Sequence, residues 1–147
     1  MMPQESKKIK VLLVEDNSAD VLLVKEALPG CSGEIELTVA SDGEQALQLL
    51  TREKRLFDLV ILDLNIPKID GLTVLKLFSP RTAPVVIFSA CCTAPDVQRA
   101  FELGAADCAQ KPLDLQEFMR EVCRIIDQWA APASKAPQLA TQTGRHA

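Results

Sequence analysis

Histidine and aromatic side chains are scarce in this sequence. Its 147 residues include one histidine, one tryptophan and no tyrosine, and aromatic residues make up 4%. The histidine, His146, lies next to the last residue, and the cysteines are odd in number and fit no zinc-binding spacing. A metal site built from cysteine and histidine is therefore not expected, and we expect reduced, buried thiols instead. The five cysteines are Cys31, Cys91, Cys92, Cys108 and Cys123.

Long hydrophobic runs and an excess of positive charge are also missing. No apolar stretch reaches the roughly 18 residues that a membrane span needs. Residues 1–10 hold no apolar signal core, so we expect a cytoplasmic protein with no membrane partner. The net charge of −4 argues against direct binding to nucleic acid. With 48% hydrophobic residues, a chain of this length favours one ordinary globular domain.

Short apolar runs alternate with helical patterns along the chain. Residues 9–14, 59–62 and 85–88 are rich in Val, Ile and Leu, which is typical of strands buried on both faces of a parallel sheet. Residues 35–39 alternate between apolar and polar, as at a sheet edge, and residues 107–110 form a short polar fifth strand. Strand and helix thus alternate five times, which predicts an α/β fold with a doubly wound, five-stranded parallel sheet.

Helix starts and apolar stripes define the predicted helices. A short helix is predicted to begin at Leu72 and to stop before Pro80, after a turn at Asp70 and Gly71. The other predicted N-terminal caps are Asn17 or Ser18, Ser41 as the start of a capping box, Thr93 with Asp96, and Asp114 with Glu117. The last two helices carry stripes at helical spacing, formed by Val97, Ala100 and Phe101, and by Leu115, Phe118, Val122, Ile125 and Trp129.

These elements place one domain at residues 9–129. Residues 1–8 are predicted to be an N-terminal extension. Residues 130–147 lack an apolar period and are rich in alanine, proline and small polar residues, so we expect a disordered tail. No DNA-binding helix pair is recognisable after Trp129, so any output is expected to act through protein binding.

Polar side chains follow four of the predicted strands at the point where each strand ends. Because the carboxyl ends of parallel strands share one edge of the sheet, where open α/β sheets bind ligands, these side chains are expected to converge. They are Glu15 and Asp16 after the first strand, Asp63 after the third, Ser89 at the end of the fourth, and Lys111 after the fifth.

Three carboxylates at one sheet edge require either that one of them takes up a proton or that a cation joins them. At an effective dielectric constant near 20, two like charges about 4 Å apart repel by about 4 kcal/mol. A set of oxygen ligands with room for water suits Mg²⁺. A metal, a lysine and a hydroxyl around one carboxylate nucleophile are the parts that phosphoryl transfer requires. The arrangement therefore predicts that Asp63 is a phosphate acceptor.

These motifs carry a family resemblance. Glu15-Asp16, Asp63 followed by Leu-Asn-Ile-Pro-Lys-Ile-Asp-Gly, Ser89-Ala90 and Lys111-Pro112 together resemble the receiver domain of bacterial two-component response regulators. The resemblance covers residues 9–129 and implies a flavodoxin-like, CheY-like sheet with strand order 2-1-3-4-5. The Glu-Asp-Asn-Ser-Ala-Asp opening, the Asp-Leu-Asn-Ile-Pro-Lys run and Trp129 are also similar to single-domain regulators paired with bacterial phytochromes.

The resemblance implies a role for each site residue. Asp63 would accept phosphate from a sensor histidine kinase or phosphotransfer protein. Asp16 and Asp63 would ligate Mg²⁺ directly, Asn65 through its backbone carbonyl, and Glu15 through metal-bound water. Ser89 and Lys111 would bind phosphoryl oxygens.

The resemblance also implies an output surface, which is the face formed by the fourth helix, fifth strand and fifth helix. That face is expected to bind an output protein or a second copy of the chain. One position departs from the family pattern: Cys108 replaces the aromatic residue that usually lies three positions before the lysine. We therefore expect the switch to act through the loop at residues 90–93, whose two cysteines are expected to be inert thiols.

Two alternatives remain open. A phosphatase of the haloacid-dehalogenase type also forms an aspartyl phosphate with Mg²⁺ and lysine, but it carries an Asp-x-Asp pattern after an early strand, whereas Asp63-Leu64-Asn65 lacks the second acid. A degenerate receiver that serves only as a scaffold is disfavoured by the intact acidic set. The first interpretation predicts no enzyme activity beyond the protein's own aspartyl phosphorylation and dephosphorylation.

Overall fold

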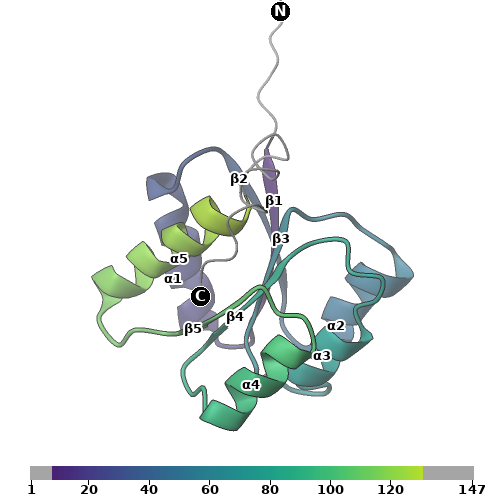
Figure 1. The fold of residues 1–147 in the computed structure, drawn as a ribbon. Coiled ribbons are helices and arrows are strands. Elements are labelled where there is room, and N and C mark those ends of the chain that lie inside the picture. Colours follow the sequence, from purple (N-terminus) through teal and green to yellow (C-terminus); the bar gives the residue numbers. More distant parts are fainter. Residues whose placement is uncertain (1–7, 131–147) are drawn as a thin grey trace, which may run out of the picture.

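Five parallel strands form the centre of the computed structural model, which describes residues 8–130. The strand order β2-β1-β3-β4-β5 confirms the predicted fold (Figure 1). β3 and β4 are buried throughout and β1 is buried from Val11 to Val14, whereas the edge strand β2 is partly exposed, as the alternation of its residues predicts. The strands are β1 (Ile9–Val14), β2 (Ile35–Ala40), β3 (Leu59–Leu62), β4 (Val85–Ser89) and β5 (Asp107–Gln110).

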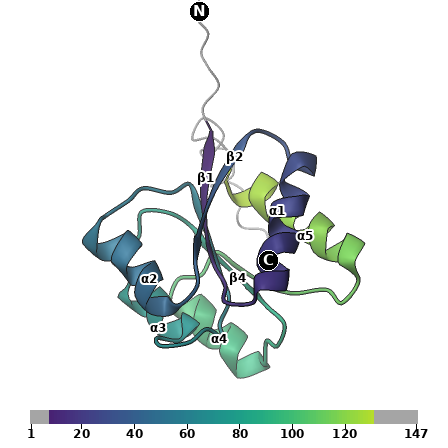
Figure 2. The same cartoon turned by 180° about the vertical axis from the view of Figure 1, so that it is seen from behind.

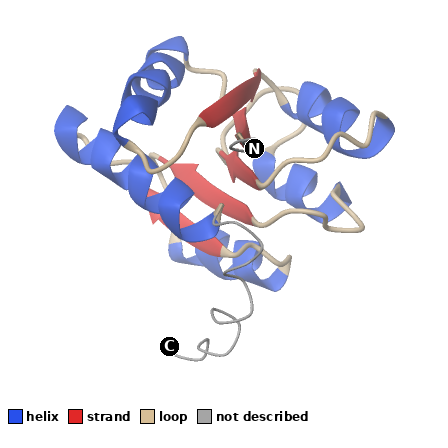
Figure 3. Ribbon diagram, turned by 90° about the horizontal axis from the view of Figure 1, so that it is seen from above, coloured by secondary structure: helices blue, strands red, loops and turns tan. Residues whose placement is uncertain are grey.

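Helices cover both faces of this sheet, which explains why its central strands are apolar throughout. α1 and α5 lie on one face, and α2, α3 and α4 lie on the other (Figures 1–3). Successive β1 residues point to opposite sides, so Leu12 joins one core and Leu13 joins the other. The helices are α1 (Ser18–Ala27), α2 (Gly43–Leu47), α3 (Gly71–Leu77), α4 (Ala94–Glu102) and α5 (Leu115–Trp129).

Two short turns extend these helices. A 3₁₀ turn, Leu28–Gly30, follows α1, and a π-helical turn, Gln48–Arg52, continues α2. Asn17, Thr93 and Asp114 cap their helices as predicted. At α2 the prediction was wrong by one position. Asp42 caps the helix by accepting the Gln45 N–H at 2.8 Å, while the Gln45 side chain reaches back to the Ser41 N–H.

The start of α3 also corrects the sequence-based prediction. Asp70 is the N-terminal cap and Gly71 is the first helical residue, so this pair begins a helix rather than forming a separate turn before Leu72. A Cβ atom on Gly71 would lie 2.5 Å from the Asp63 carbonyl oxygen. Glycine is therefore required here because the backbone of α3 contacts the backbone next to Asp63.

The predicted apolar stripes are buried at their central positions, but the prediction is wrong for two residues that are exposed. Ala100, Phe118 and Val122 are buried, but Phe101 is 47% exposed and Leu115 is 60% exposed. A helical period indicates the direction of the core, but it does not show how far the neighbouring elements extend over the sides and first turn of a helix.

The cysteines differ from the sequence-based expectation. Cys31 and Cys123 form a disulfide with a Cα–Cα distance of 4.8 Å, because α1 and α5 pack side by side and bring together positions 92 residues apart. Cys91 is exposed and free, so it is not the buried thiol that was expected. Cys92 and Cys108 are also free and are half-buried.

The predicted N-terminal extension and C-terminal tail lie outside the described residues, apart from positions 8 and 130. Ala130 is buried in the core between the sheet, α1 and α5. Within residues 8–130, no helix combines the length and apolar character that crossing a membrane would require.

Candidate functional site

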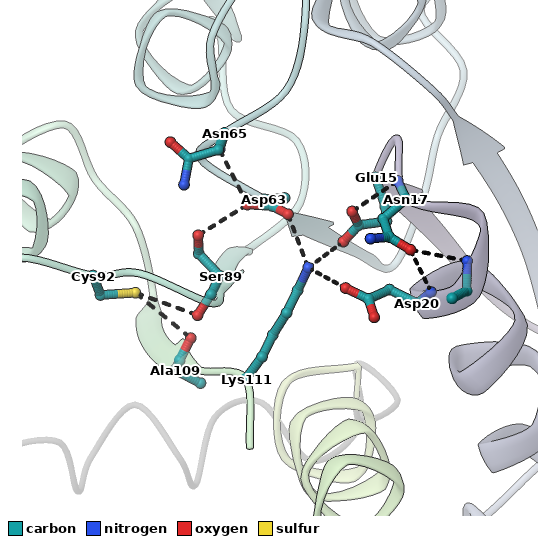
Figure 4. Close-up of polar contacts among 10 residues, drawn as sticks. Glu15, Asn17, Asp20, Asp63, Asn65, Ser89, Cys92, Ala109 and Lys111 are labelled. Atoms are coloured by element: carbon teal, nitrogen blue, oxygen red, sulfur yellow. Dashed lines mark hydrogen bonds and ion pairs between the residues drawn. The ribbon is translucent and has the colours of Figure 1, made fainter. Parts of the chain in front are cut away.

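The sheet holds the predicted site residues in place through backbone hydrogen bonds that continue past the ends of the strands. The Glu15 N–H bonds to the Ala40 carbonyl at 2.9 Å, and the Asp63 N–H bonds to the Val14 carbonyl at 3.1 Å. The Lys111 N–H bonds to the Ser89 carbonyl at 2.8 Å. Each side chain therefore starts from a backbone position fixed by its neighbouring strand, and the residues meet at one edge of the sheet (Figure 4).

Asp63 lies at the centre of the site with both carboxylate oxygens engaged. Its Oδ1 accepts hydrogen bonds from the Ser89 hydroxyl at 2.9 Å and from the Asn65 N–H at 3.0 Å. Its Oδ2 accepts a hydrogen bond from Lys111 Nζ at 2.9 Å. Ser89 and Asp63 are both buried. The carboxylate is thus held by a hydroxyl on one side and an ammonium group on the other, with little freedom to rotate.

Lys111 contacts three carboxylates at once. Its Nζ lies 2.6 Å from Glu15 Oε1, 2.8 Å from Asp20 Oδ2 and 2.9 Å from Asp63 Oδ2 (Figure 4). Burial alone would lower the pKa of this lysine, since its side chain is only 7% exposed, but the three hydrogen bonds raise its pKa above the ordinary value. An ammonium group has three hydrogens, and here each has a carboxylate acceptor.

Asp20 is the member of this site that the sequence analysis missed. It lies in the first turn of α1, where its N–H donates to the capping oxygen of Asn17 at 3.1 Å. Acidic residues are common in first turns because the helix dipole favours them, so its position alone carried no functional signal.

Glu15, Asp16 and Asp63 form an acidic cluster beside this lysine. Each offers a carboxylate oxygen, and these oxygens lie within 4.8 Å of one another. Burial and the negative charge of Asp63 raise the pKa of Glu15, whereas the hydrogen bond from Lys111 lowers it. The net result is a rise from 4.5 to about 7. The set consists entirely of oxygen donors and carries excess negative charge, and Asp16 is open to solvent. These properties fit a hard divalent cation that keeps some of its water.

The role predicted for Asn65 stays a prediction. Its N–H bonds to Asp63, which places the residue beside the cluster, while metal binding would use its carbonyl oxygen.

The loop between β3 and α3, which follows Asp63, is held in place by two backbone hydrogen bonds. The Gly71 N–H bonds to the Leu64 carbonyl at 3.0 Å, which closes the loop on itself. The Gly43 N–H bonds to the Pro67 carbonyl at 3.2 Å, and a Cβ atom on Gly43 would clash with the Ile69 carbonyl oxygen. The start of α2 therefore packs directly on this loop, and the loop supports Asp63 rigidly.

Two free cysteines, Cys92 and Cys108, lie near the end of β4. The Cys92 thiol is 3.7 Å from the Ser89 carbonyl oxygen and 3.9 Å from that of Ala109 (Figure 4). Burial raises the pKa of Cys92, and it raises the pKa of Cys108 to about 11. Both thiols therefore stay protonated near neutral pH, which favours a packing role over reactivity.

Comparison with known proteins supports the interpretation of this geometry. A family model of the response regulator receiver domain matches residues 11–123. A probable chemotaxis protein CheY from Rhizobium etli is 37% identical over 117 residues, which are 77% of this chain and 88% of that protein. A protein-glutamate methylesterase/protein-glutamine glutaminase from Anaeromyxobacter dehalogenans is 37% identical over 124 residues, or 80% of this chain. The match spans only 35% of that enzyme.

Two solved structures share the fold. The phosphorylated cyanobacterial phytochrome response regulator RcpA has a TM-score of 0.77 and 30% sequence identity, with coverage of 85% of this chain and 96% of that one. A second response regulator, in its Mn²⁺-bound form, has a TM-score of 0.76 and 31% identity, with the same coverage.

Proposed function

Because this chain belongs to the response regulator receiver domain family, we propose that it is a phosphoryl switch in which Asp63 is the acceptor. One observation carries this proposal. The Asp63 carboxylate is held between the Ser89 hydroxyl and the Lys111 ammonium, each at 2.9 Å. It also forms an acidic cluster with Glu15 and Asp16. This arrangement combines a nucleophile, a cation site and two donors for phosphoryl oxygens.

The chemistry follows from these positions. An Asp63 oxygen attacks the phosphorus of the donor, an O–P bond forms, and the bond from phosphorus to the donor breaks, with its electrons leaving on the donor group. Glu15, Asp16, Asp63 and the Asn65 carbonyl would hold Mg²⁺, which supplies positive charge to the phosphoryl oxygens. Lys111 exchanges its contact with Asp63 Oδ2 for a phosphoryl oxygen, and the Ser89 hydroxyl donates to another.

Incubation with Mg²⁺ and acetyl phosphate tests the acceptor. Intact-mass measurement should show one added phosphoryl group on the native protein and none on Asp63→Asn. Asp58→Asn is the matched control, because Asp58 lies just before β3, at the end of the strand opposite Asp63. The Asp58 side chain accepts a hydrogen bond from the Lys10 N–H, and an asparagine side chain can accept the same bond. Labelling of Asp63→Asn at the native rate would place the acceptor elsewhere.

A receiver function is favoured over both alternatives. The family match covers residues 11–123, which include all five strands apart from the first two residues of β1, and nothing in residues 8–130 favours a phosphatase of the haloacid-dehalogenase type. The acidic cluster and lysine argue against a degenerate scaffold. We propose no enzyme activity beyond the protein's own phosphorylation and dephosphorylation. The methylesterase relative extends far beyond the matched region, so its activity is not carried over.

We propose a sensor histidine kinase or phosphotransfer protein as the phosphodonor. The likeness to a phytochrome response regulator makes a photoreceptor kinase a donor to test first. The expected cytoplasmic location and the absence of nucleic-acid and membrane partners stay predictions.

We propose that output uses the face formed by α4, β5 and α5, either with an output protein or as a homodimer. Phe101 is exposed there, and Arg124 bridges Glu121 at 2.8 Å and Asp107 at 3.5 Å, so the face combines an apolar side chain with charges of both signs. Sedimentation with and without beryllofluoride, a phosphoryl mimic, tests the homodimer. Phe101→Glu should abolish any dimer, whereas Leu77→Glu, at an exposed leucine on α3, should not.

A further inference from the structure

The Lys111 ammonium has one carboxylate partner that lies outside the acidic cluster. Glu15 and Asp63 belong both to the lysine's contacts and to the set of residues that would hold Mg²⁺. Asp20 contacts the lysine at 2.8 Å and is not in that set. Figure 4 shows Asp20 approaching Nζ from α1, while Asp63 and Glu15 approach from the ends of their strands.

The lysine and a divalent cation compete for the same oxygens. With Lys111 in place, Glu15 Oε1 and Asp63 Oδ2 each accept one of its hydrogens at 2.6 and 2.9 Å. A cation bound by these carboxylates takes up their lone pairs and repels the ammonium group. Lys111 would then lose two of its three partners. Because its side chain is only 7% exposed, water cannot readily replace them.

We propose that Asp20 is a positioning residue that holds the Lys111 ammonium while Glu15 and Asp63 turn to Mg²⁺, and that it thereby raises the affinity of the site for Mg²⁺. Asp20 gives the lysine an anionic partner that the metal does not need. Without this partner, the ammonium must either stay on Glu15 and Asp63 or remain buried without a counter-charge. This inference rests on the proposed function, since it assumes a cation at the acidic cluster.

Local structure suits Asp20 to this task. The Asn17 N–H bonds to Glu15 Oε2 at 3.1 Å, and Asn17 Oδ1 accepts the N–H of Asp20 at 3.1 Å. The helix cap therefore links the backbone of Asp20 to a cluster member. The Asp20 side chain is 24% exposed, so it remains partly solvated when the lysine moves. Its place in the first turn also lets the helix dipole stabilise its charge.

Calorimetric titration of Mg²⁺ into the native protein and four variants tests the proposal without relying on phosphorylation. The variants are Asp20→Asn, Lys111→Met, the double variant of both, and Glu117→Gln. Glu117 is the matched control, because it is an exposed acid in the first turn of α5 whose backbone N–H bonds to its own capping residue Asp114. Thermal melts without Mg²⁺ check that each variant folds, and Asp20→Ser replaces Asp20→Asn if the latter does not.

If Asp20 affects Mg²⁺ affinity only through Lys111, the affinities of the variants should follow a distinct pattern. Asp20→Asn should weaken Mg²⁺ binding about three- to tenfold, the size expected for one charge-assisted hydrogen bond. Lys111→Met should strengthen binding because it removes the competitor. In the Lys111→Met background, adding Asp20→Asn should change the affinity by less than about twofold. Glu117→Gln should match the native protein.

Three results would each have a distinct meaning. If neither the native protein nor Glu117→Gln bound Mg²⁺, the proposed function itself would be wrong, and this inference with it. If both bound Mg²⁺ and Asp20→Asn bound it equally well, only the role of Asp20 would be overturned. An equal loss from Asp20→Asn with and without Lys111 would show that Asp20 acts by its charge alone, which would also overturn the positioning role.

Discussion

The Ser89 hydroxyl donates a 2.9 Å hydrogen bond to Asp63 Oδ1 and so joins the ends of β4 and β3. The family resemblance implies that Ser89 binds a phosphoryl oxygen once Asp63 is phosphorylated. The hydroxyl already points to the acceptor carboxylate, so phosphorylation would exchange one acceptor oxygen for another nearby rather than swing the side chain inward.

Replacing Ser89 should therefore affect the transfer step. Ser89→Ala removes a donor to the phosphoryl oxygens, and we expect the initial rate of phosphorylation by acetyl phosphate to fall about tenfold, which corresponds to about 1.4 kcal/mol. Ser89→Thr retains the hydroxyl and should keep most of the rate. The measurement is the time course of the phosphorylated fraction by intact mass. A native rate in Ser89→Ala would show that the hydroxyl does not contribute to transfer.

The positions of the main site residues could be predicted because they depend on topology. Asp63, Ser89 and Lys111 follow or end short strand segments, and parallel strands bring such ends to one edge. This reasoning needs only the strand boundaries and the direction of the chain. It does not require the orientation of any side chain.

The contacts that were missed depend on how helices lie against the sheet. Asp20 reaches Lys111 only because the first turn of α1 lies where the long lysine side chain ends, and the pairing of Cys31 with Cys123 depends on the packing of α1 against α5. Neither relationship leaves a spacing pattern in the sequence. Phe101 and Leu115 were misplaced for a related reason, because periodicity gives the direction of an apolar face and not its extent.

The raised pKa of Glu15 predicts how the stability of the metal-free protein depends on pH. Its pKa is about 7 in the folded protein, compared with an ordinary value of 4.5, because of burial. The folded state therefore binds this proton more tightly than the unfolded state does. The resulting stabilisation is present below about pH 4.5 and is lost as pH rises through about 7.

Mg²⁺ should oppose this loss, since a cation favours the ionised carboxylate. We expect the increase in Tm caused by Mg²⁺ to be larger at about pH 8 than at about pH 5.5. Glu15→Gln, which cannot ionise, should show a smaller difference between the two conditions. Differential scanning calorimetry across this range is the measurement. A Mg²⁺ effect that is equal at both pH values in the native protein would contradict the raised pKa.

Arg81 should stabilise the junction between α3 and α4. Its guanidinium group is partly buried, which lowers its pKa, and its hydrogen bonds all go to backbone carbonyls near the ends of these helices. They are Leu75 at 2.8 Å, Phe78 at 3.0 Å, Leu103 at 3.1 Å and Gly104 at 3.1 Å. One side chain thus satisfies several acceptors that the helices leave unpaired.

Arg81→Ala should lower the free energy of unfolding by about 2 kcal/mol, because it leaves several of these carbonyls without a partner. Arg81→Lys should recover only part of the loss, since an ammonium group lacks the planar fork of a guanidinium group. Urea denaturation is the measurement, and Arg120→Ala, at an exposed arginine on α5, is the control. Equal stability of Arg81→Ala and Arg120→Ala would show that these contacts do not stabilise the fold.

The output switch should run through the loop after Ser89 rather than through Cys108. Residues 90–93 connect Ser89 to Thr93, which caps α4, and the Gln110 side chain donates to the Ala90 carbonyl at 3.2 Å. Cys108 is a half-buried side chain with a single torsion to its sulfur, so it cannot act as a rotating aromatic group would. A backbone shift that follows the change of acceptor oxygen at Ser89 would therefore pass along this loop to the start of α4.

Hydrogen exchange with and without beryllofluoride measures this movement. Exchange should change most across residues 89–96, because the loop and the first turn of α4 are directly linked to Ser89. Cys108→Ala should keep that difference nearly intact, whereas Asp63→Asn, the negative control, should lose it. If Cys108→Ala removed the change at residues 89–96 while the protein still bound beryllofluoride, the cysteine itself would relay the signal and the loop pathway would be wrong.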